Sequence, residues 1–133
     1  MQVIIYTNEF GGVSVCAPTG EISTEAVLAK DCPSHAIIVH SSELPEEHND
    51  FFNAWELNVG KVTVNHTKAQ GITKDRLRAE RAPLLTALDV QYQRAQEDGR
   101  DTTIIISEKQ RLRDVTKLAD TATTLDELKA LSA

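Results

Sequence analysis

The sequence is poor in aromatic residues and has no long hydrophobic run. Aromatic side chains make up 5% of its 133 residues, whereas hydrophobic residues together make up 41%, so any core must be mostly aliphatic. No segment approaches the roughly 20 consecutive apolar residues of a transmembrane helix, so no membrane span is expected. Residues 1–6 lack the basic start and the apolar stretch of a signal peptide, which predicts a soluble protein made in the cytoplasm.

Cysteine is also scarce. Cys16 and Cys32 are too few for a disulfide scaffold and lack the C-x-x-C spacing of a zinc or redox site. We interpret them as reduced, partly buried thiols, although a bridge between them stays open because spacing alone does not give their distance. Cys32 with His35 and His40 matches no zinc module, so neither a structural metal nor a cofactor is expected.

Sequence signatures of catalysis are missing. No serine lies in a G-x-S-x-G turn, and no glycine-rich loop of the kind that holds a phosphate is present. Carboxylates cluster between Glu43 and Asp50, but this stretch is polar and offers no apolar surroundings to raise a pKa. We therefore expect no enzymatic activity and assign no catalytic residue.

Charge is distributed unevenly along the chain. Residues 1–64 contain two lysines and nine acidic residues, whereas residues 65–133 contain twelve basic and eleven acidic residues. The first part is acidic and the second nearly neutral. Because an acidic surface repels nucleic acid and anionic lipid, any binding of nucleic acid would have to involve the second part.

The first 65 residues have the pattern of a small β-rich head. Apolar runs at 3–6 and 13–17 flank the pair Gly11–Gly12, which predicts a hairpin. Ser23 is placed to cap a short helix over 24–30. The continuous apolar run 36–40 predicts a strand buried on both faces, and residues 41–50 are expected to form an exposed loop.

A second hairpin is predicted around Val59–Gly60. Apolar residues alternate with polar ones on both sides of this pair, which places on one face Trp55, Leu57, Val62 and Val64. The single tryptophan, Trp55, is either a core anchor of this hairpin or, if exposed, a hot spot of an interface.

From His66 the apolar period changes from 2 to about 3.6, which predicts helices. The first is expected over about 66–98, with an apolar stripe of Leu77, Leu84, Leu88, Tyr92 and Ala95. Pro83 lies within this pattern and either kinks one long helix or begins a second. Further helices are predicted at about 102–120 and, from the capping-box pattern Thr124–Glu127, at about 124–131.

The expected fold class is therefore α+β. A β-rich α+β head over residues 1–65, with two hairpins, a short helix and a further strand, precedes a helical region over residues 66–133, with an α-helical hairpin and a short C-terminal helix. The alanine-rich stripes make a thin core, so we expect the helical region to pack on the head, on another protein or on copies of itself. The candidate protein-interface residues are Trp55, Leu84, Leu88 and Tyr92.

Two groups of basic residues in the helical region allow two interpretations. The groups are Lys74, Arg76, Arg78 and Arg81, and Lys109, Arg111, Arg113 and Lys117. Acidic residues interleave with them at helical spacing, which favours salt-bridged, solvated faces. The alternative is a nucleic-acid surface, for which a recognisable helix-turn-helix and aromatic residues are both missing.

Several stretches resemble small proteins encoded in tailed-bacteriophage genomes, often among tail and tail-fibre genes. The stretches are Asn53–Glu56, Val62–Asn65, Lys68–Ala69, Arg76–Arg78, Arg81–Leu85, Leu88–Ala95, Lys109–Asp114 and Thr124–Lys129. The resemblance covers the chain from Asn53 onward, and the preceding residues only in outline. A β head followed by helices is also distantly similar to tail-fibre assembly proteins, whose helical sequences differ.

This resemblance implies a non-enzymatic structural protein of the virion, made in the host cytoplasm and located at the tail, the baseplate or the fibre attachment. Its partners would be other tail or fibre proteins, and we expect several symmetric copies. Two alternatives stay open: a tail-fibre or tail assembly chaperone absent from the mature particle, and a small nucleic-acid-binding regulator. The formal net charge of −6 argues against the regulator.

Overall fold

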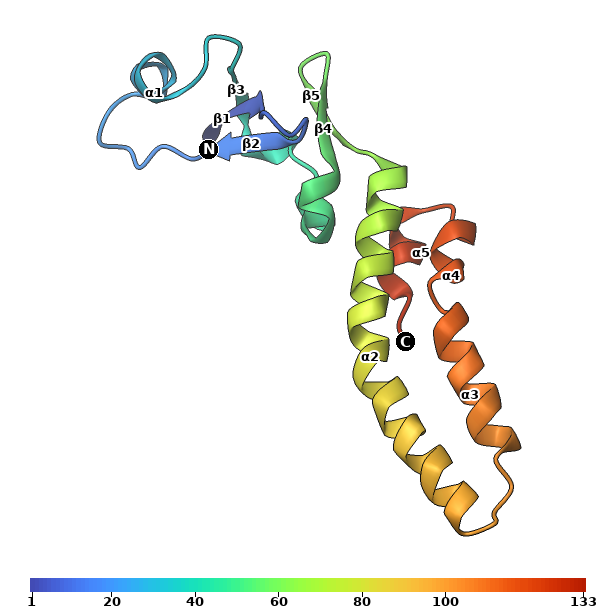
Figure 1. Cartoon of the computed structure of the whole chain (residues 1–133). Coiled ribbons are helices and arrows are strands. Elements are labelled where there is room, and N and C mark those ends of the chain that lie inside the picture. The colour runs from blue at the N-terminus through green and yellow to red at the C-terminus, as the bar shows by residue number, and fades with distance from the viewer. The chain divides into compact units, whose positions relative to one another are not determined.

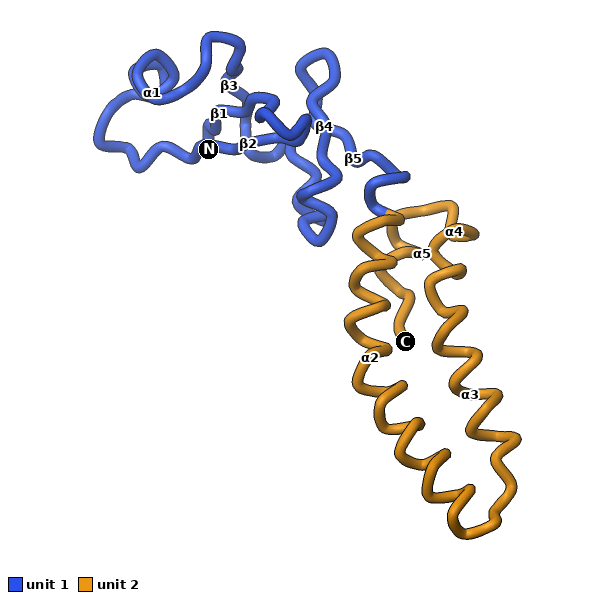
Figure 2. Tube along the Cα trace, viewed as in Figure 1, with its two compact units in different colours: residues 1–69 blue, residues 70–133 orange.

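A computed structural model describes all residues, 1–133, and shows an α+β fold with two compact units (Figures 1 and 2). Unit 1 comprises Met1–Ala69 and unit 2 comprises Gln70–Ala133. All strands belong to unit 1, so the predicted fold class is confirmed. The boundary lies slightly later than the predicted one after residue 65. Lys68 Nζ, in the first turn of the long helix, pairs with Glu56 Oε1 of unit 1 at 2.9 Å, which ties that turn to the strands.

Unit 1 is built on a three-stranded antiparallel sheet in the order β2-β1-β3. The central strand β1 (Gln2–Thr7) pairs with β2 (Val13–Cys16) and with β3 (Ile37–His40). Ile5 lies opposite Val15 on one side and Ile37 on the other. The first predicted hairpin and the strand predicted within 36–40 are both confirmed.

Both faces of this sheet are covered, because successive side chains of a strand point to opposite faces. One face packs against the hairpin of β4 (Trp55–Asn58) and β5 (Lys61–Val64), in a cluster whose buried members are Val3, Ile5, Val13 and Trp55. The other face packs against α1 (Thr24–Asp31), in a cluster whose buried members are Ile4, Val27 and Ala36. β3 contributes to both clusters, as predicted, but its side chains there are only partly buried, because β3 is an edge strand of the sheet.

The local signals in unit 1 that depend on turns and caps are also confirmed. Ser23 caps α1, since its Oγ accepts a hydrogen bond from the N–H of Ala26 at 3.2 Å. In the β4–β5 hairpin Trp55 lies opposite Val64, and the turn residues Val59 and Gly60 have φ of 49° and 78°. Two positive φ values are the requirement of a type I′ turn, which matches the twist of the paired strands.

The segment predicted as an exposed loop at 41–50 is more regular than expected. It contains the 3₁₀ helix η1 (Ser41–Glu43) and the start of η2 (Glu46–Ala54). Phe51 and Ala54, at the end of η2, are buried and anchor it. The sequence did not reveal this because 3₁₀ turns are short and have no apolar period of their own.

Unit 2 is a helical hairpin with two further short helices. α2 (His66–Glu97) is one helix with Pro83 inside it, which decides between the two predicted possibilities in favour of a single long helix. α3 (Thr103–Asp114) runs back beside it (Figure 1). None of the helices combines the length and the apolar character that a transmembrane span requires.

The helix predicted at 102–120 is divided in two. α3 ends at Asp114, and α4 (Lys117–Thr121) is a separate short helix. Arg81 of α2 donates from Nη1 to the carbonyl oxygens of Leu112 at 3.4 Å and Arg113 at 2.9 Å. The Leu112 carbonyl also accepts from the N–H of Val115 at 3.4 Å, and the bonds from Arg81 add a partner at the end of α3, which stabilises its termination.

The last helix, α5 (Leu125–Ala130), confirms the predicted C-terminal helix. Thr124 Oγ1 accepts from the N–H of Glu127 at 3.1 Å, as in a capping box, but the Glu127 carboxylate accepts from the N–H of Thr123 rather than that of Thr124. α5 lies against α2, where Arg76 donates to the carbonyl of Leu128 at 3.1 Å.

Candidate protein-interaction surface

The α2–α3 hairpin is covered by α5 over only part of its length. Arg76 donates to the α5 backbone, and the N–H of Ala133, which follows α5, donates to Glu80 Oε2 at 3.1 Å. Glu80 is the last residue of α2 that these bonds reach. The next residue on this face of α2 is Leu84, four positions after Glu80. Leu84 is 44% exposed, whereas Leu77, which lies beside the bonded segment, is 0% exposed.

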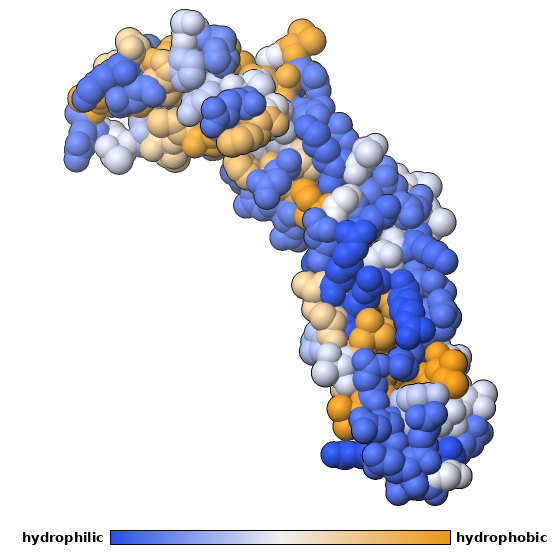
Figure 3. Space-filling view, in the orientation of Figure 1, coloured by the Kyte–Doolittle hydropathy of each residue, from blue (hydrophilic) through white to orange (hydrophobic).

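We call residues 84–110, which include the last turns of α2, the connection and the first turns of α3, the hairpin end. Four large aliphatic side chains are exposed on it: Leu84 at 44%, Val90 at 45%, Ile104 at 82% and Ile106 at 49%. Figure 3 shows apolar residues (orange) on this part of unit 2. Single exposed aliphatic residues are common, but such a group in one short segment indicates a contact surface.

The hairpin end also carries a cavity of about 400 Å³, lined by Gln91, Arg94, Ala95, Arg100, Asp101 and Ile105. Gln91 and Ala95 follow Leu84 by seven and eleven residues and share its face of α2. The surface therefore combines an exposed aliphatic side chain with a concave part, and polar groups surround it.

Asp101 supplies a fixed negative charge to this cavity. Its Oδ1 accepts from the Thr103 hydroxyl at 2.7 Å and from the Thr103 N–H at 3.0 Å. These two bonds, the hydroxyl bond first, lower the pKa of the Asp101 carboxyl below its ordinary value. The carboxylate is thus held at the start of α3, where its charge is favourable to the helix dipole.

The structure separates the four candidate interface residues into different environments. Leu84 is exposed, whereas Leu88 and Tyr92 are half-buried. The Tyr92 ring lies under Lys109 Nζ, 5.0 Å from the ring centroid, and Lys109 also pairs with Asp89 at 2.6 Å. Leu88 and Tyr92 therefore already have contacts within the hairpin and can offer only part of their surface to another molecule.

Trp55 is corrected from a candidate interface residue to a core residue. It is 2% exposed and packs against the three-stranded sheet, and its Nε1–H donates to the carbonyl of His48 at 3.3 Å. The sequence allowed both roles because an alternating hairpin has one buried and one solvated face, and only the tertiary packing determines which face is covered.

Ile104 and Ile106 were not among the predicted contact residues. They flank Ile105 in the run Ile104-Ile105-Ile106, which lies in the first turn of α3. Neighbouring residues of a helix are turned by about 100° from one another, so three consecutive isoleucines cannot all face one partner helix. This run was the available signal that at least one large aliphatic side chain would be exposed.

Seven of the eight basic residues considered for nucleic-acid binding have partners within unit 2. Arg81 bonds to backbone carbonyls of α3, and six others pair with carboxylates: Lys74, Arg76, Arg78, Lys109, Arg111 and Lys117. Most of these are exposed pairs that contribute little to stability. They support the interpretation of these positions as salt-bridged faces.

The cysteine and histidine residues form no site in the structure. Cys16 and Cys32 are free thiols and half-buried, and burial, followed by the neighbouring Cys16, raises the pKa of the Cys32 thiol. A raised pKa leaves less of the reactive thiolate. No group of three or more His, Cys, Asp or Glu side chains is arranged to hold a metal ion.

Comparison of the chain with protein families, with curated proteins and with solved structures found no match. Its function is therefore inferred from its own surfaces and from the sequence resemblance described above.

Proposed function

We propose that the protein is a non-enzymatic structural component of a bacteriophage virion, at the tail, the baseplate or the fibre attachment, and that it binds neighbouring tail or fibre proteins through the hairpin end. The resemblance of the chain to tail-cluster proteins from Asn53 onward supports the phage setting. The proposed mode of action rests on one observation: Leu84 and Ile104, on adjacent helices, are 44% and 82% exposed.

The exposed residues are not explained by the stability of unit 2 itself. Leu77, Leu112 and Leu128 are 0–1% exposed and form a core where α5 covers the hairpin. Leu84 and Ile104 lie outside this core, so replacing them with polar residues removes little buried area. Burying them against a partner would gain roughly 25 cal/mol for each Å² of apolar surface removed from water.

The first experiment is mass spectrometry of purified virions from the phage that encodes the chain. We expect the protein in mature particles in a fixed ratio to a tail protein. Its presence in infected cells together with its absence from particles would contradict a virion role and support the assembly chaperone instead. Retention on DNA that falls steeply with salt would support the nucleic-acid-binding regulator.

The second experiment locates the contact. We expect Leu84→Ser with Ile104→Ser to reduce incorporation into particles at least tenfold, while the circular dichroism spectrum and thermal midpoint of the isolated protein stay close to wild type. Leu118→Ser is the control, because Leu118 is 49% exposed in α4 but lies outside the hairpin end. Equal effects of the control and the double variant would contradict a contact through this face.

A further inference from the structure

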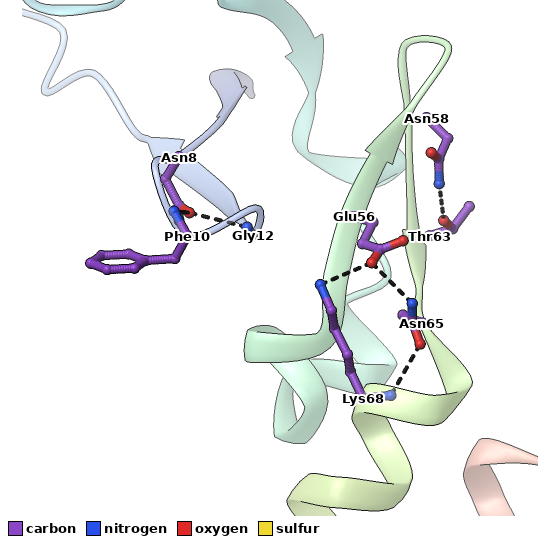
Figure 4. A network of polar contacts seen from close by, with 8 residues as sticks. All are labelled: Asn8, Phe10, Gly12, Glu56, Asn58, Thr63, Asn65 and Lys68. Atoms are coloured by element: carbon purple, nitrogen blue, oxygen red, sulfur yellow. Dashed lines mark hydrogen bonds and ion pairs between the residues drawn. The ribbon is translucent and has the colours of Figure 1, made fainter.

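Phe10 is an aromatic side chain that unit 1 leaves almost entirely in solvent. It lies in the turn between β1 and β2 and is 86% exposed. Of the other two phenylalanines, Phe51 is 3% exposed and Phe52 is 39% exposed. In Figure 4 the Phe10 ring points away from the strands. A chain so poor in aromatic residues thus presents one of them on a turn, where it is available for contact.

The turn that carries Phe10 is fixed by Asn8. The Asn8 Oδ1 accepts from the N–H of Phe10 and from the N–H of Gly12, both at 3.0 Å (Figure 4). The N–H of Asn8 donates to the carbonyl of Gly12 at 2.9 Å, and Gly11 has a φ of 80°, which residues with a side chain rarely adopt. Because this turn is ordered before any contact, binding through Phe10 loses little conformational entropy.

Unit 1 also has a groove of about 480 Å³ between its sheet and the β4–β5 hairpin. The apolar part of the groove is formed by Ile5, Val39, Leu44 and Val62, and its charged residues are Glu43 and Lys61. The volume is within the range of about 300–1,000 Å³ that is usual for binding pockets. β5 borders this groove and pairs with no strand other than β4.

Val59 stands at the margin of this groove in a strained conformation. Its side chain is fully exposed, at 103%, and its φ of 49° is in the left-handed region. Asparagine or glycine normally occupies this position of a type I′ turn, and a β-branched residue is disfavoured there. The turn therefore presents an aliphatic side chain next to the groove at a conformational cost that an asparagine or glycine would avoid.

We propose that Phe10 of one copy of this chain inserts into the groove of a second copy. The charges favour this occupant: exposed Glu9 adjoins Phe10, and exposed Lys61 borders the groove. Glu43, also on the groove, would repel Glu9, so the turn can dock only with Glu9 towards Lys61. The inserted ring would contact Val59, which gives that side chain a role.

The geometry of this contact is head-to-tail. The turn belongs to β1 and β2, whereas the groove is lined by residues of β1, β3, η1 with the adjoining Leu44, and the β4–β5 hairpin. None of the groove residues belongs to the turn, so one copy can insert its Phe10 and receive that of another copy simultaneously. Such heterologous contacts form rings when the rotation closes and filaments when it does not.

A membrane is a less suitable partner for Phe10. Residues 1–64 contain nine acidic residues against two lysines, which disfavours approach to an anionic lipid and to a second copy alike. However, the groove of a second copy offers Lys61 to Glu9, whereas an anionic lipid offers no cation. The contact between copies does not depend on the proposed virion role, since it is a property of the purified chain.

Sedimentation of the purified chain up to about 1 mM is the first test, and concentration-dependent association is expected. Phe10→Ser should weaken this association by about 30-fold or more, as at a hot spot. Ile22→Ser is the control, because Ile22 is 46% exposed in unit 1 but belongs to neither the turn nor the groove; it should associate as wild type does. A wild-type chain that stays monomeric, or a Phe10→Ser chain that associates normally, would overturn the proposal.

Mixing two defective variants tests the head-to-tail geometry. Glu43→Phe introduces a bulky side chain at an exposed position that lines the groove, and it leaves Phe10 intact and Trp55 the single tryptophan, whereas Phe10→Ser leaves the groove intact. Each variant alone should be monomeric, but their mixture should form a one-to-one dimer that does not grow further. Absence of this dimer, with both variants folded by Trp55 fluorescence, would overturn the proposal.

Charge reversal gives a second readout that does not alter the apolar parts. Glu9→Lys and Lys61→Glu should each weaken association by about two- to fivefold, and the double variant should restore it. Phe10-dependent binding to anionic vesicles without self-association would contradict the proposal in favour of a lipid partner.

Discussion

The two units of this chain bury their aliphatic residues in different ways. In unit 1 a three-stranded sheet is covered on one face by α1 and on the other by the β4–β5 hairpin, so Ile4 and Ile5 are both buried although they point in opposite directions. In unit 2 two helices pack together, and α5 adds a third layer over only part of them. Unit 1 therefore completes its core within itself, whereas unit 2 leaves the hairpin end uncovered.

This difference shows why similar leucines have different roles along α2. Leu77 and Leu84 belong to the same apolar stripe, but they are 0% and 44% exposed. What distinguishes them is the extent of α5 and of the residues after it: Arg76 donates to Leu128 of α5, and the N–H of Ala133, beyond α5, donates to Glu80. An incomplete third layer therefore changes part of an ordinary helix pair into a surface available to a partner.

Removal of the central anchor of unit 1 is expected to have the largest effect. Trp55→Ala should lower the free energy of unfolding by about 3–5 kcal/mol, because it empties the cluster beneath the sheet. Hydrogen exchange of the β1 amides measures this in unit 1. Phe52→Ala, whose ring is 39% exposed and 4.9 Å from that of Trp55, should cost about 1 kcal/mol. Equal costs would show that Trp55 does not anchor unit 1.

The third layer of unit 2 can be tested in the same way. Leu128→Ala in α5 should cost about 2–5 kcal/mol, because Leu128 is 0% exposed. Circular dichroism reports mainly the helices, whereas fluorescence of the single tryptophan reports unit 1. The unfolding transition followed by circular dichroism should therefore shift further than the one followed by fluorescence. Leu118→Ala, at a position 49% exposed in α4, should leave both transitions nearly unchanged. Equal shifts in the two Leu→Ala variants would contradict the assigned core.

The helix caps allow a comparison of the two units by one kind of substitution. Ser23→Ala removes the cap of α1, and Thr124→Ala removes that of α5. Each should lower stability by about 1 kcal/mol, because the N–H of Ala26 or of Glu127 loses its acceptor. Thermal unfolding measures both changes. An effect in only one unit would mean that, in the other unit, water replaces the lost hydroxyl acceptor without a loss of stability.

The smallest expected effect is a pH dependence at the contact of α2 with the chain end. The hydrogen bond from Arg76, followed by that from the Ala133 N–H, lowers the pKa of the Glu80 carboxyl. A carboxyl whose folded pKa is depressed contributes stability above its unfolded pKa of about 4.3 and loses it as the pH falls through the folded value. Wild type should therefore exceed Glu80→Gln in stability at pH 7, and the difference should disappear at acidic pH.

Urea midpoints of wild type and Glu80→Gln at pH 7 and pH 3 give this difference. Glu97→Gln, at an exposed position near the end of the same helix, is the control and should show little difference at pH 7. A Glu80 difference that persists unchanged at pH 3 would show that its origin is not the carboxylate charge.

The features that the sequence predicted correctly depend on local signals. Alternating residues and the pair Val59–Gly60 predicted the β4–β5 hairpin and the residues that share its apolar face, and Ser23 predicted the start of α1. The features that it missed depend on distant residues. α3 ends near residues whose carbonyl groups bond to Arg81, and Arg81 lies 31 positions before Leu112 in the sequence. No periodicity near residue 114 reveals this contact.

The candidate site was predictable only in part for the same reason. The stripe in α2 identified Leu84, Leu88 and Tyr92 as apolar, but burial of Trp55 and exposure of Leu84 are decided by which elements pack over them. Phe10 was visible in the sequence as part of a turn, yet the bonds of Asn8 that fix it appear only in three dimensions.

Pro83 divides α2 at the edge of the uncovered surface. A proline has no backbone N–H, so the carbonyl of Ala79 has no partner inside the helix, and one rung of its bonding ladder is absent. This position separates the turns that α5 contacts from those that it leaves open. The amides that follow Pro83 can therefore exchange with deuterium by opening as a segment of their own, while the earlier turns stay closed. A partner that binds there would be detected first as slower exchange in this segment alone.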